Sequence, residues 1–193
     1  MCEMSQHRRD TIRIVDKIHK AFSDVDYPVN MQIISELDDS LEAQELRDSL
    51  RGKNWRDIDA VFLNKYCIQG IFFLEFQAYR YFLPAFLLAS VNEYDRCFDI
   101  TKDILTTLLQ PVTRQEMFRS GARQETVSDL YSFTCRMRGL TCLQVEVIVD
   151  YLKFLCDYHL SDFPDNEPRL ALDEYWLERM KKEDAREGNN KKL

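Results

Sequence analysis

The segment that most constrains the fold of this chain is residues 71–91, IFFLEFQAYRYFLPAFLLASV, which is apolar and long enough to suggest a membrane span. Two charged residues, Glu75 and Arg80, lie inside it, and each would cost roughly 2.5–3.5 kcal/mol near the centre of a membrane helix. Pro84 interrupts the segment as well, so the run of ~20 apolar residues that a span requires is not reached. We therefore expect no membrane span and predict a central helix of a water-soluble domain.

The same segment carries an apolar stripe at helical spacing. The stripe consists of Phe72, Phe76, Tyr79 and Leu83. Pro84 has no N–H group and disfavours helical geometry at the residue before it. Two interpretations are open, a single helix that kinks at the proline or two successive helices. The sequence favours the second, with one helix ending near Phe82 and another beginning at Pro84.

Composition points to helices for the rest of the chain. The 193 residues include 45% hydrophobic residues, enough for a sizeable core, and only 5 Gly and 5 Pro, too few for a sandwich or barrel with many turns. No segment shows a clear strand pattern. We predict an all-α fold, a single globular domain of about seven helices over residues 1–183. Residues 184–193 are charged, lack apolar periodicity and are predicted to form a disordered tail.

Capping patterns and apolar periodicity place the other helices. The first helix is predicted over residues 6–22. Its inner stripe is expected to be Ile12, Val15, His19 and Phe22, with Ile14 and Ile18 widening it. A capping box, Asp39-x-x-Glu42, is expected to begin a second helix that runs to Leu50 and is ended by Gly52. Asn54 is expected to begin a third helix. The apolar face of this third helix is predicted to be Trp55, Ile58, Phe62 and Tyr66. Three further helices are predicted: one over residues 99–110, one that begins at the capping box Thr141-x-x-Gln144 and ends near His159, and one over residues 169–183. Residues 111–139 show the least regular pattern in the chain.

Charge and cysteine usage exclude several classes of function. The net charge of −7 argues against non-specific binding of nucleic acid, which needs a basic surface. The six cysteines form no C-x-x-C pair and are predicted to be free thiols, several of them buried. Cys156 and His159 make only half of a metal site, so no metal is expected. The N-terminal residues show no secretory signal, and we expect a cytoplasmic protein.

The strongest candidate for a binding surface is an acidic stretch around the helix that ends at Leu50. Its carboxylates could simply form a solvated helix face, or they could dock a partner. The predicted partner-binding residues are Asp38, Asp39, Glu42, Glu45 and Asp48. A second cluster of charge, the arginines between Arg114 and Arg138, leaves open whether an anion binds there.

A series of short motifs in fixed order resembles an uncharacterised family of small bacterial helical proteins, a domain-of-unknown-function family. The motifs are Trp55-x-x-Ile58, Tyr79-x-Tyr81-Phe82-Leu83-Pro84-Ala85-Phe86, Leu140-Thr141-x-x-Gln144, Tyr151-Leu152-x-Phe154-Leu155 and Ala171-Leu172-x-x-Tyr175-Trp176. Phe82 stands where the family often has Tyr. The resemblance spans residues 39–177; it implies a helical fold and a bacterial origin, and it brings no catalytic residues.

These observations favour a protein-interaction role over catalysis. None of the three histidines lies in a recognisable nucleophile, metal or phosphate motif, so no enzyme activity and no cofactor are expected. We predict a protein partner, and a basic one would be attracted by the acidic stretch. The specific hypothesis is an immunity-type inhibitor of a toxin. The alternative is an enzyme or small-ligand regulatory domain with a pocket near Glu75 and Arg80. The oligomeric state stays open.

Overall fold

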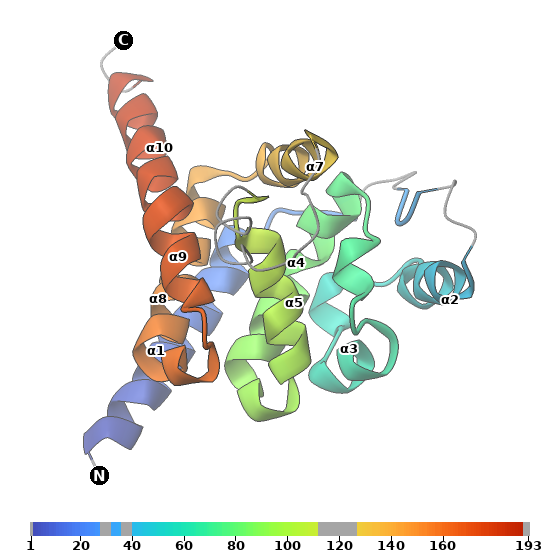
Figure 1. Cartoon of the computed structure of the whole chain (residues 1–193), viewed down its shortest axis with the longest axis horizontal. Helices are drawn as coiled ribbons and strands as arrows, with labels where there is room; N and C mark the ends of the chain where they lie inside the picture. The colour runs from blue at the N-terminus through green and yellow to red at the C-terminus, as the bar shows by residue number, and fades with distance from the viewer. Residues whose placement is uncertain (1, 28–31, 36–39, 112–126, 191–193) are drawn as a thin grey trace. The chain divides into compact units, whose positions relative to one another are not determined.

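Helices dominate the structure, a computed structural model that describes residues 2–27, 32–35, 40–111 and 127–190 (Figure 1). Within these ranges the only β pairing is one isolated antiparallel bridge between Ile34 and Leu74. The predicted all-α fold class is therefore confirmed. Among the helices in the described ranges, none has the combination of length and apolar character that crossing a bilayer demands.

The chain divides into two compact units. Unit 1 contains residues 1–17 and 108–193, and unit 2 contains residues 18–107. Unit 1 holds most of α1 (Cys2–Ala21), α7 (Val127–Met137), α8 (Cys142–Tyr158), η4 (Leu160–Asp162), α9 (Glu167–Ala171), the π-helix η5 (Leu172–Trp176) and α10 (Leu177–Asn190). Unit 2 holds the end of α1, α2 (Leu41–Leu50), η1 (Trp55–Asp57), α3 (Ala60–Tyr66), η2 (Gly70–Phe72), α4 (Phe76–Asn92), η3 (Tyr94–Arg96) and nearly all of α5 (Phe98–Leu108).

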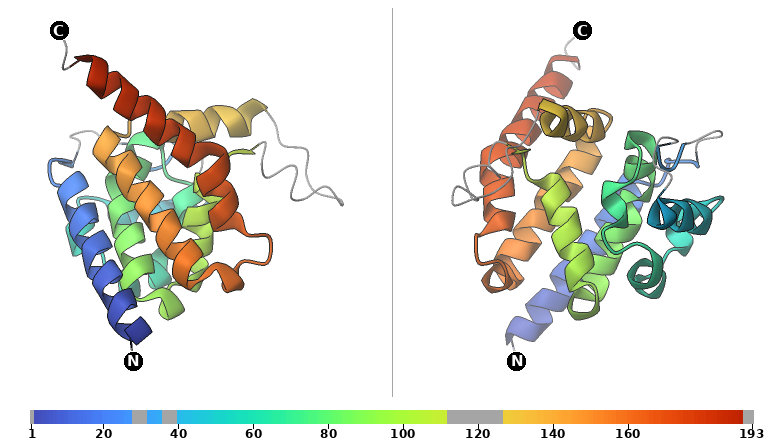
Figure 2. Two further views of the ribbon diagram at one scale, coloured as in Figure 1. Left: turned by 90° about the vertical axis from the view of Figure 1, so that its left-hand side faces the viewer. Right: turned by 45° about the vertical axis from the view of Figure 1, so that its right-hand side comes forward.

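The central helix of unit 1 is α8, which begins with the predicted capping box. The Thr141 hydroxyl accepts a hydrogen bond from the Gln144 backbone N–H, and the Gln144 side chain accepts one from the Thr141 N–H. This exchange satisfies two N–H groups that a helix start would leave unpaired. The helix packs on α9, η5 and α10. Its other neighbour is α1 (Figure 2), from which Lys17 forms ion pairs with Glu146 and Asp150.

The central helix of unit 2 is α4, and it corrects the predicted break at Pro84. The helix runs without interruption from Phe76 to Asn92, with the proline inside it. Most of its residues are buried, so packing on nearly every side outweighs the ~3 kcal/mol that a proline costs inside a helix. The predicted stripe is also wrong at its start, because Phe72 lies in the separate turn η2 and is 38% exposed.

Two buried hydroxyl pairs join α4 to α5 in the core of unit 2. The Tyr79 hydroxyl lies 2.8 Å from the Thr107 hydroxyl, and the Ser90 hydroxyl lies 2.7 Å from that of Thr101. Each pair satisfies polar groups that would otherwise be costly to bury. The inward face of α5 consists of Ile100, Ile104, Leu105 and Leu108, which are all buried.

The structure confirms one part of the predicted inner face of α1 and corrects another. Ile14, Ile18 and Phe22 are buried, at i, i+4 and i+8, whereas Ile12 and His19 are exposed. The inward positions predicted for Ile14, Ile18 and Phe22 are therefore confirmed, whereas those predicted for Ile12 and His19 are wrong. His19 lies over the buried Trp55 ring, with the ring centroids 5.8 Å apart.

Two predicted helix starts also differ. The N-cap of α2 is Ser40, whose hydroxyl accepts from the Ala43 N–H; Asp39, the predicted cap, lies outside the described residues. Asn54 caps only the short turn η1, and Asp59 caps α3 by accepting from the Phe62 N–H. Gly52 adopts φ +70 just after α2, as expected for a glycine that ends a helix.

The C-terminal helices extend further than the sequence predicts. Residues 127–137, within the region expected to be least regular, form α7, and α10 continues to Asn190, so the predicted helix end at residue 183 is too early. An ion pair from Glu178 to Lys182, at i and i+4, supports α10 on its exposed side.

Candidate functional site

The predicted partner-binding residues that the structure describes lie on α2. Glu42, Glu45 and Asp48 are all exposed, whereas Asp38 and Asp39 lie outside the described residues. The helix buries Ala43, Leu46 and Leu50, and this apolar face fixes which side turns to solvent. Glu42 and Glu45 are three residues apart, so their carboxylates are neighbours on the exposed side.

The basic residues near α2 leave two of these carboxylates without an ion pair. Arg47 donates to the Ser35 carbonyl at 3.4 Å, and Arg51 pairs with Asp48 at 3.5 Å. Within the described ranges, Glu42 and Glu45 form no ion pair with a side chain. The negative charge available to a partner is therefore concentrated at the N-terminal half of α2. There the carboxylates also interact favourably with the positive end of the helix dipole and so stabilise the helix.

Glu42 and Glu45 form one wall of a groove of about 220 Å³ within unit 2. We call this the acidic groove. It is lined by Glu42, Glu45, Leu46, Asn64, Lys65, Tyr66, Ile68, Gly70 and Phe73. The opposite wall comes from the end of α3 and the residues that follow it, so the groove joins a negatively charged helix to an apolar segment.

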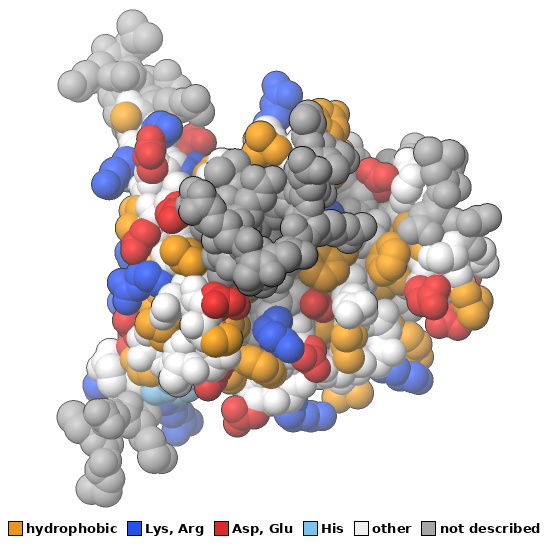
Figure 3. Space-filling model, in the orientation of Figure 1, with side chains coloured by type: hydrophobic (Ala, Val, Ile, Leu, Met, Phe, Trp, Pro, Cys, Tyr) orange, Lys and Arg blue, Asp and Glu red, His pale blue; other side chains and the backbone are white. Residues whose placement is uncertain are grey.

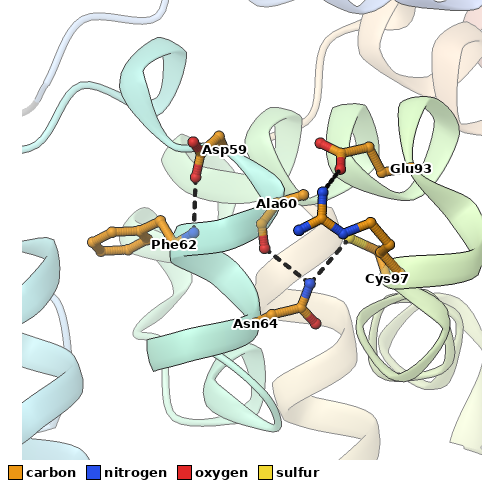
Figure 4. Close-up of polar contacts among 7 residues, drawn as sticks. Asp59, Ala60, Phe62, Asn64, Glu93 and Cys97 are labelled. Atoms are coloured by element: carbon orange, nitrogen blue, oxygen red, sulfur yellow. Dashed lines mark hydrogen bonds and ion pairs between the residues drawn. The ribbon is translucent and has the colours of Figure 1, made fainter.

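Three polar contacts hold α3 in place (Figure 4). The Asp59 carboxylate accepts from the Phe62 N–H at 2.8 Å, and the Asn64 amide donates to the Ala60 carbonyl at 2.9 Å and to the Cys97 sulfur at 3.5 Å. Burial raises the pKa of the Cys97 thiol, which therefore stays uncharged as an acceptor. These contacts use the Asn64 amide nitrogen, and Asn64 also lines the acidic groove.

The segment after α3 is fixed equally well. Gln69 adopts φ +59, an unusual value for a residue with a side chain, and its N–H donates to the Asp103 carboxylate at 2.7 Å. Burial raises the pKa of this carboxyl group, and the hydrogen bond from Gln69 opposes that effect. A Cβ at Gly70 would lie 3.1 Å from a methyl group of Leu46, so the glycine allows α2 to approach this segment closely.

The apolar wall of the acidic groove is unusually exposed. Tyr66 is 42% exposed, Ile68 48% and Phe73 37%, and Lys65 lies with its ammonium group 4.7 Å from the centre of the Tyr66 ring. On the face shown in Figure 3, hydrophobic side chains gather over α2 and α3 with acidic ones beside them. Apolar side chains that cluster at a surface with a polar rim are typical of protein-binding sites.

Sequence reasoning found the acidic wall of the groove and missed the apolar one. Tyr66 was expected to face the core, and Ile68 and Phe73 were not singled out. The helix α3 begins at Ala60, later than predicted, so it turns Tyr66 outward while Leu63 and Cys67 are buried. A weak signal is present for Tyr66 and Ile68, which have Lys65, Gln69 and Gly70 close by in the sequence, but none for Phe73, which lies in the apolar run Ile71–Leu74.

The two residues of the predicted alternative pocket, Glu75 and Arg80, lie at the start of α4. Glu75 is the N-cap of this helix, and its backbone N–H donates to the Ile33 carbonyl at 2.9 Å. Both side chains are half-buried, and neither lines the acidic groove. The structure therefore does not bring this pair together with the carboxylates of α2.

Comparison with known proteins gives a family and nothing more specific. The model of a family described as "Family of unknown function (DUF6714)" matches residues 10–180, from α1 to α10. No curated protein and no solved structure matches the chain. The match covers most of both units, and the expected membership of an uncharacterised family is confirmed. The chain therefore belongs to the family of unknown function DUF6714.

Proposed function

We propose that this protein is a protein-binding module whose acidic groove docks a positively charged protein partner. The observation that carries the proposal is that one groove is lined both by three exposed apolar side chains and by two carboxylates that form no ion pair with a described residue. Apolar anchors supply most of the affinity of an interface, and rim charges supply steering and selectivity. The acidic groove offers both within a rigid frame.

The two walls have different roles in this proposal. Tyr66, Ile68 and Phe73 receive apolar side chains of the partner and exclude water from the contact. Glu42 and Glu45 attract lysine and arginine side chains, and the net charge of −7 extends this attraction over a longer range. The Asn64 oxygen accepts a hydrogen bond from the partner.

Within this role we propose an immunity-type inhibitor that acts in the cytoplasm and covers a basic toxin. The support is chemical: enzymes that cleave nucleic acid present basic surfaces, and a cluster of carboxylates on a rigid helix imitates the charge of their substrate. Such an inhibitor needs no catalytic group of its own.

The test begins with capture of the partner from the native host at low salt, where surface charges are least screened. The partner is identified by mass spectrometry and purified, and its binding kinetics are measured by surface plasmon resonance. We expect the double variant Glu42→Lys/Glu45→Lys to bind about tenfold more weakly, chiefly through slower association. The matched control is Asp16→Lys/Asp165→Lys, which changes the net charge equally at two exposed positions outside the groove.

The apolar wall is tested separately. Ile68→Ser should speed dissociation, because an apolar side chain that the bound partner buries affects mainly the dissociation rate. Leu143→Ser, at an apolar residue on α8 with similar exposure, is the control. Wild-type kinetics for both groove variants would exclude this surface. A captured partner without basic character, bound equally well at high salt, would exclude the electrostatic part of the proposal.

A further inference from the structure

Unit 1 contains a larger cavity of about 480 Å³ that the proposed protein-binding role does not use. It is bounded by α7, the π-helix η5 and α10. Its lining residues are Gln110, Thr134, Arg138, Glu174, Tyr175, Glu178, Arg179, Lys182 and Glu183. The volume lies within the range of about 300–1,000 Å³ that is typical of small-molecule sites.

The π-helix sets the shape of one wall. The Leu177 N–H donates to the Leu172 carbonyl five residues back, which gives the wider turn of a π-helix. Such turns are rare and are frequently found at functional sites. Here the turn buries Trp176, whose indole N–H donates to the Leu108 carbonyl at 2.9 Å, and places Tyr175 against Phe133. One turn later, Arg179 follows on the same side.

Arg179 is held firmly, and none of its contacts with described residues is with a carboxylate. Its guanidinium donates to the Met137 carbonyl at 2.8 Å and to the Tyr175 hydroxyl at 3.1 Å, and it lies 5.6 Å from the centre of the Trp176 ring. Across the described ranges, neither Arg179 nor Arg138 forms an ion pair. Two arginines without counter-ions therefore line the same cavity.

The carboxylates of the cavity, in contrast, already have partners. Glu178 pairs with Lys182 at 2.7 Å, Glu183 lies 3.9 Å from the Cys142 thiol, and Glu174 is engaged in a contact of its own. The positive charge of the arginines is thus the charge left for a ligand. Arginine also has the planar arrangement of N–H groups that matches the oxygens of phosphates and carboxylates.

We propose that this cavity binds a small oxyanion, either a phosphate ester or a carboxylate, between Arg138 and Arg179. Arg179 is preorganised by its contacts with Met137 and Tyr175, and the exposed Arg138 closes on the anion from the end of α7. The Tyr175 hydroxyl, which accepts from Arg179, donates to the ligand. The cavity is larger than inorganic phosphate, so the ligand also carries an organic part that lies against the Tyr175 ring.

The experiment is calorimetric titration of the full chain with inorganic phosphate and, separately, with succinate, each in a chloride buffer of constant ionic strength. We expect at least one of the two to bind, and the better binder identifies the oxyanion class. Arg138→Gln should weaken binding about tenfold or more, since a hydrogen bond to a charged group is lost. Glu178→Gln should strengthen it severalfold by releasing Lys182 from its ion pair.

Arg51→Gln is the matched control, because Arg51 is an exposed arginine of unit 2 at the end of α2. The Arg51→Gln variant should bind phosphate or succinate with the same affinity as the wild type. Arg138 is exposed, so its loss leaves the fold intact, and a circular dichroism spectrum verifies this. Failure of both anions to bind the wild type, or equal affinity of the wild type and Arg138→Gln, would overturn the proposal. Neither result bears on the acidic groove.

Discussion

Asp10 and Tyr158 show how single residues join α1 to α8 in unit 1. The Tyr158 hydroxyl donates to the Asp10 carboxylate at 2.6 Å, and Gln6 donates to the same oxygen. The bond from Tyr158 is the main reason why the pKa of Asp10 lies below its ordinary value. The same bond raises the pKa of Tyr158 to about 12. Each group is therefore held in the protonation state that the hydrogen bond needs.

Tyr158→Phe should lower the free energy of unfolding by about 1 kcal/mol at neutral pH, because the donor to Asp10 is lost at a partly exposed site. The lowered pKa of Asp10 stabilises the fold above its ordinary value of 3.8, and this contribution is lost as the pH falls through the folded pKa. The raised pKa of Tyr158 stabilises the fold below its ordinary value of 10.0, and this contribution is lost as the pH rises towards about 12. Urea unfolding at several pH values measures the difference.

The difference between wild type and Tyr158→Phe should thus be largest between pH 3.8 and 10.0 and shrink outside that window. Tyr66→Phe, at a tyrosine with no hydrogen bond among the described contacts, is the control and should show no such window. A difference that is constant from acid to alkaline pH would contradict the assigned bond.

At the scale of residues, the sequence predicts the charged side chains of the candidate site but not the groove that they line. Glu42 and Glu45 were predicted as binding residues from their charge and spacing, and both line the acidic groove. The groove itself could not be predicted, because its floor depends on Leu46 meeting Gly70 from another segment. Its apolar wall depends on where α3 begins, and the cap at Asp59 decides this. Local patterns name candidate residues, but tertiary contacts decide which of them share a site.

At the scale of elements, α4 shows burial overriding a local signal. Pro84 favours a helix break, and the structure keeps one helix from Phe76 to Asn92. The capping box at Thr141 and Gln144, in contrast, was predicted correctly because its chemistry is complete within four residues. Signals that are satisfied locally are therefore the ones that sequence reasoning recovers, whereas a proline can be outweighed by the apolar residues around it.

Pro84→Ala tests whether α4 is continuous in solution. The alanine restores the N–H that a helix interior uses, worth up to about 3 kcal/mol, and loses part of the buried proline ring at roughly 0.8 kcal/mol per methylene. We expect the free energy of unfolding to rise by about 1 kcal/mol. The helical circular dichroism signal should stay unchanged, because the wild-type helix already passes through this position. A clear gain of helical signal in the variant would indicate a break in the wild type.

At the scale of the whole molecule, the family model matches one continuous range of the chain, whereas the structure divides the chain into two compact units. The match over residues 10–180 runs through both units, so both belong to the family's common architecture. The motifs that suggested the family lie mainly in the cores of these units: Trp55, Phe82, Tyr151 and Trp176 are all fully buried. The motifs that indicate the family are therefore residues of the packed cores. They give no support to the acidic groove or to the arginine cavity, which are inferred from the geometry of this structure alone.

The burial pattern predicts which parts of the molecule open least often. In unit 2, α4 is buried along most of its length, and in unit 1 α8 is the helix with the most buried apolar residues. Amides in such helices exchange only in large openings, because their hydrogen bonds are shielded by packing. We therefore expect hydrogen exchange, followed by mass spectrometry of peptides, to be slowest in α4 and α8.

The comparison within each unit makes this prediction specific. Peptides from α2, which is short and exposed on its groove side, should exchange much faster than those from α4. Peptides from the end of α10 should exchange faster than those from α8. Similar exchange in α2 and α4 would contradict the assignment of α4 as the core of unit 2. Slow exchange at α2 that appears only on adding the captured partner would instead support docking at the acidic groove, since a bound partner shields the helix that it covers.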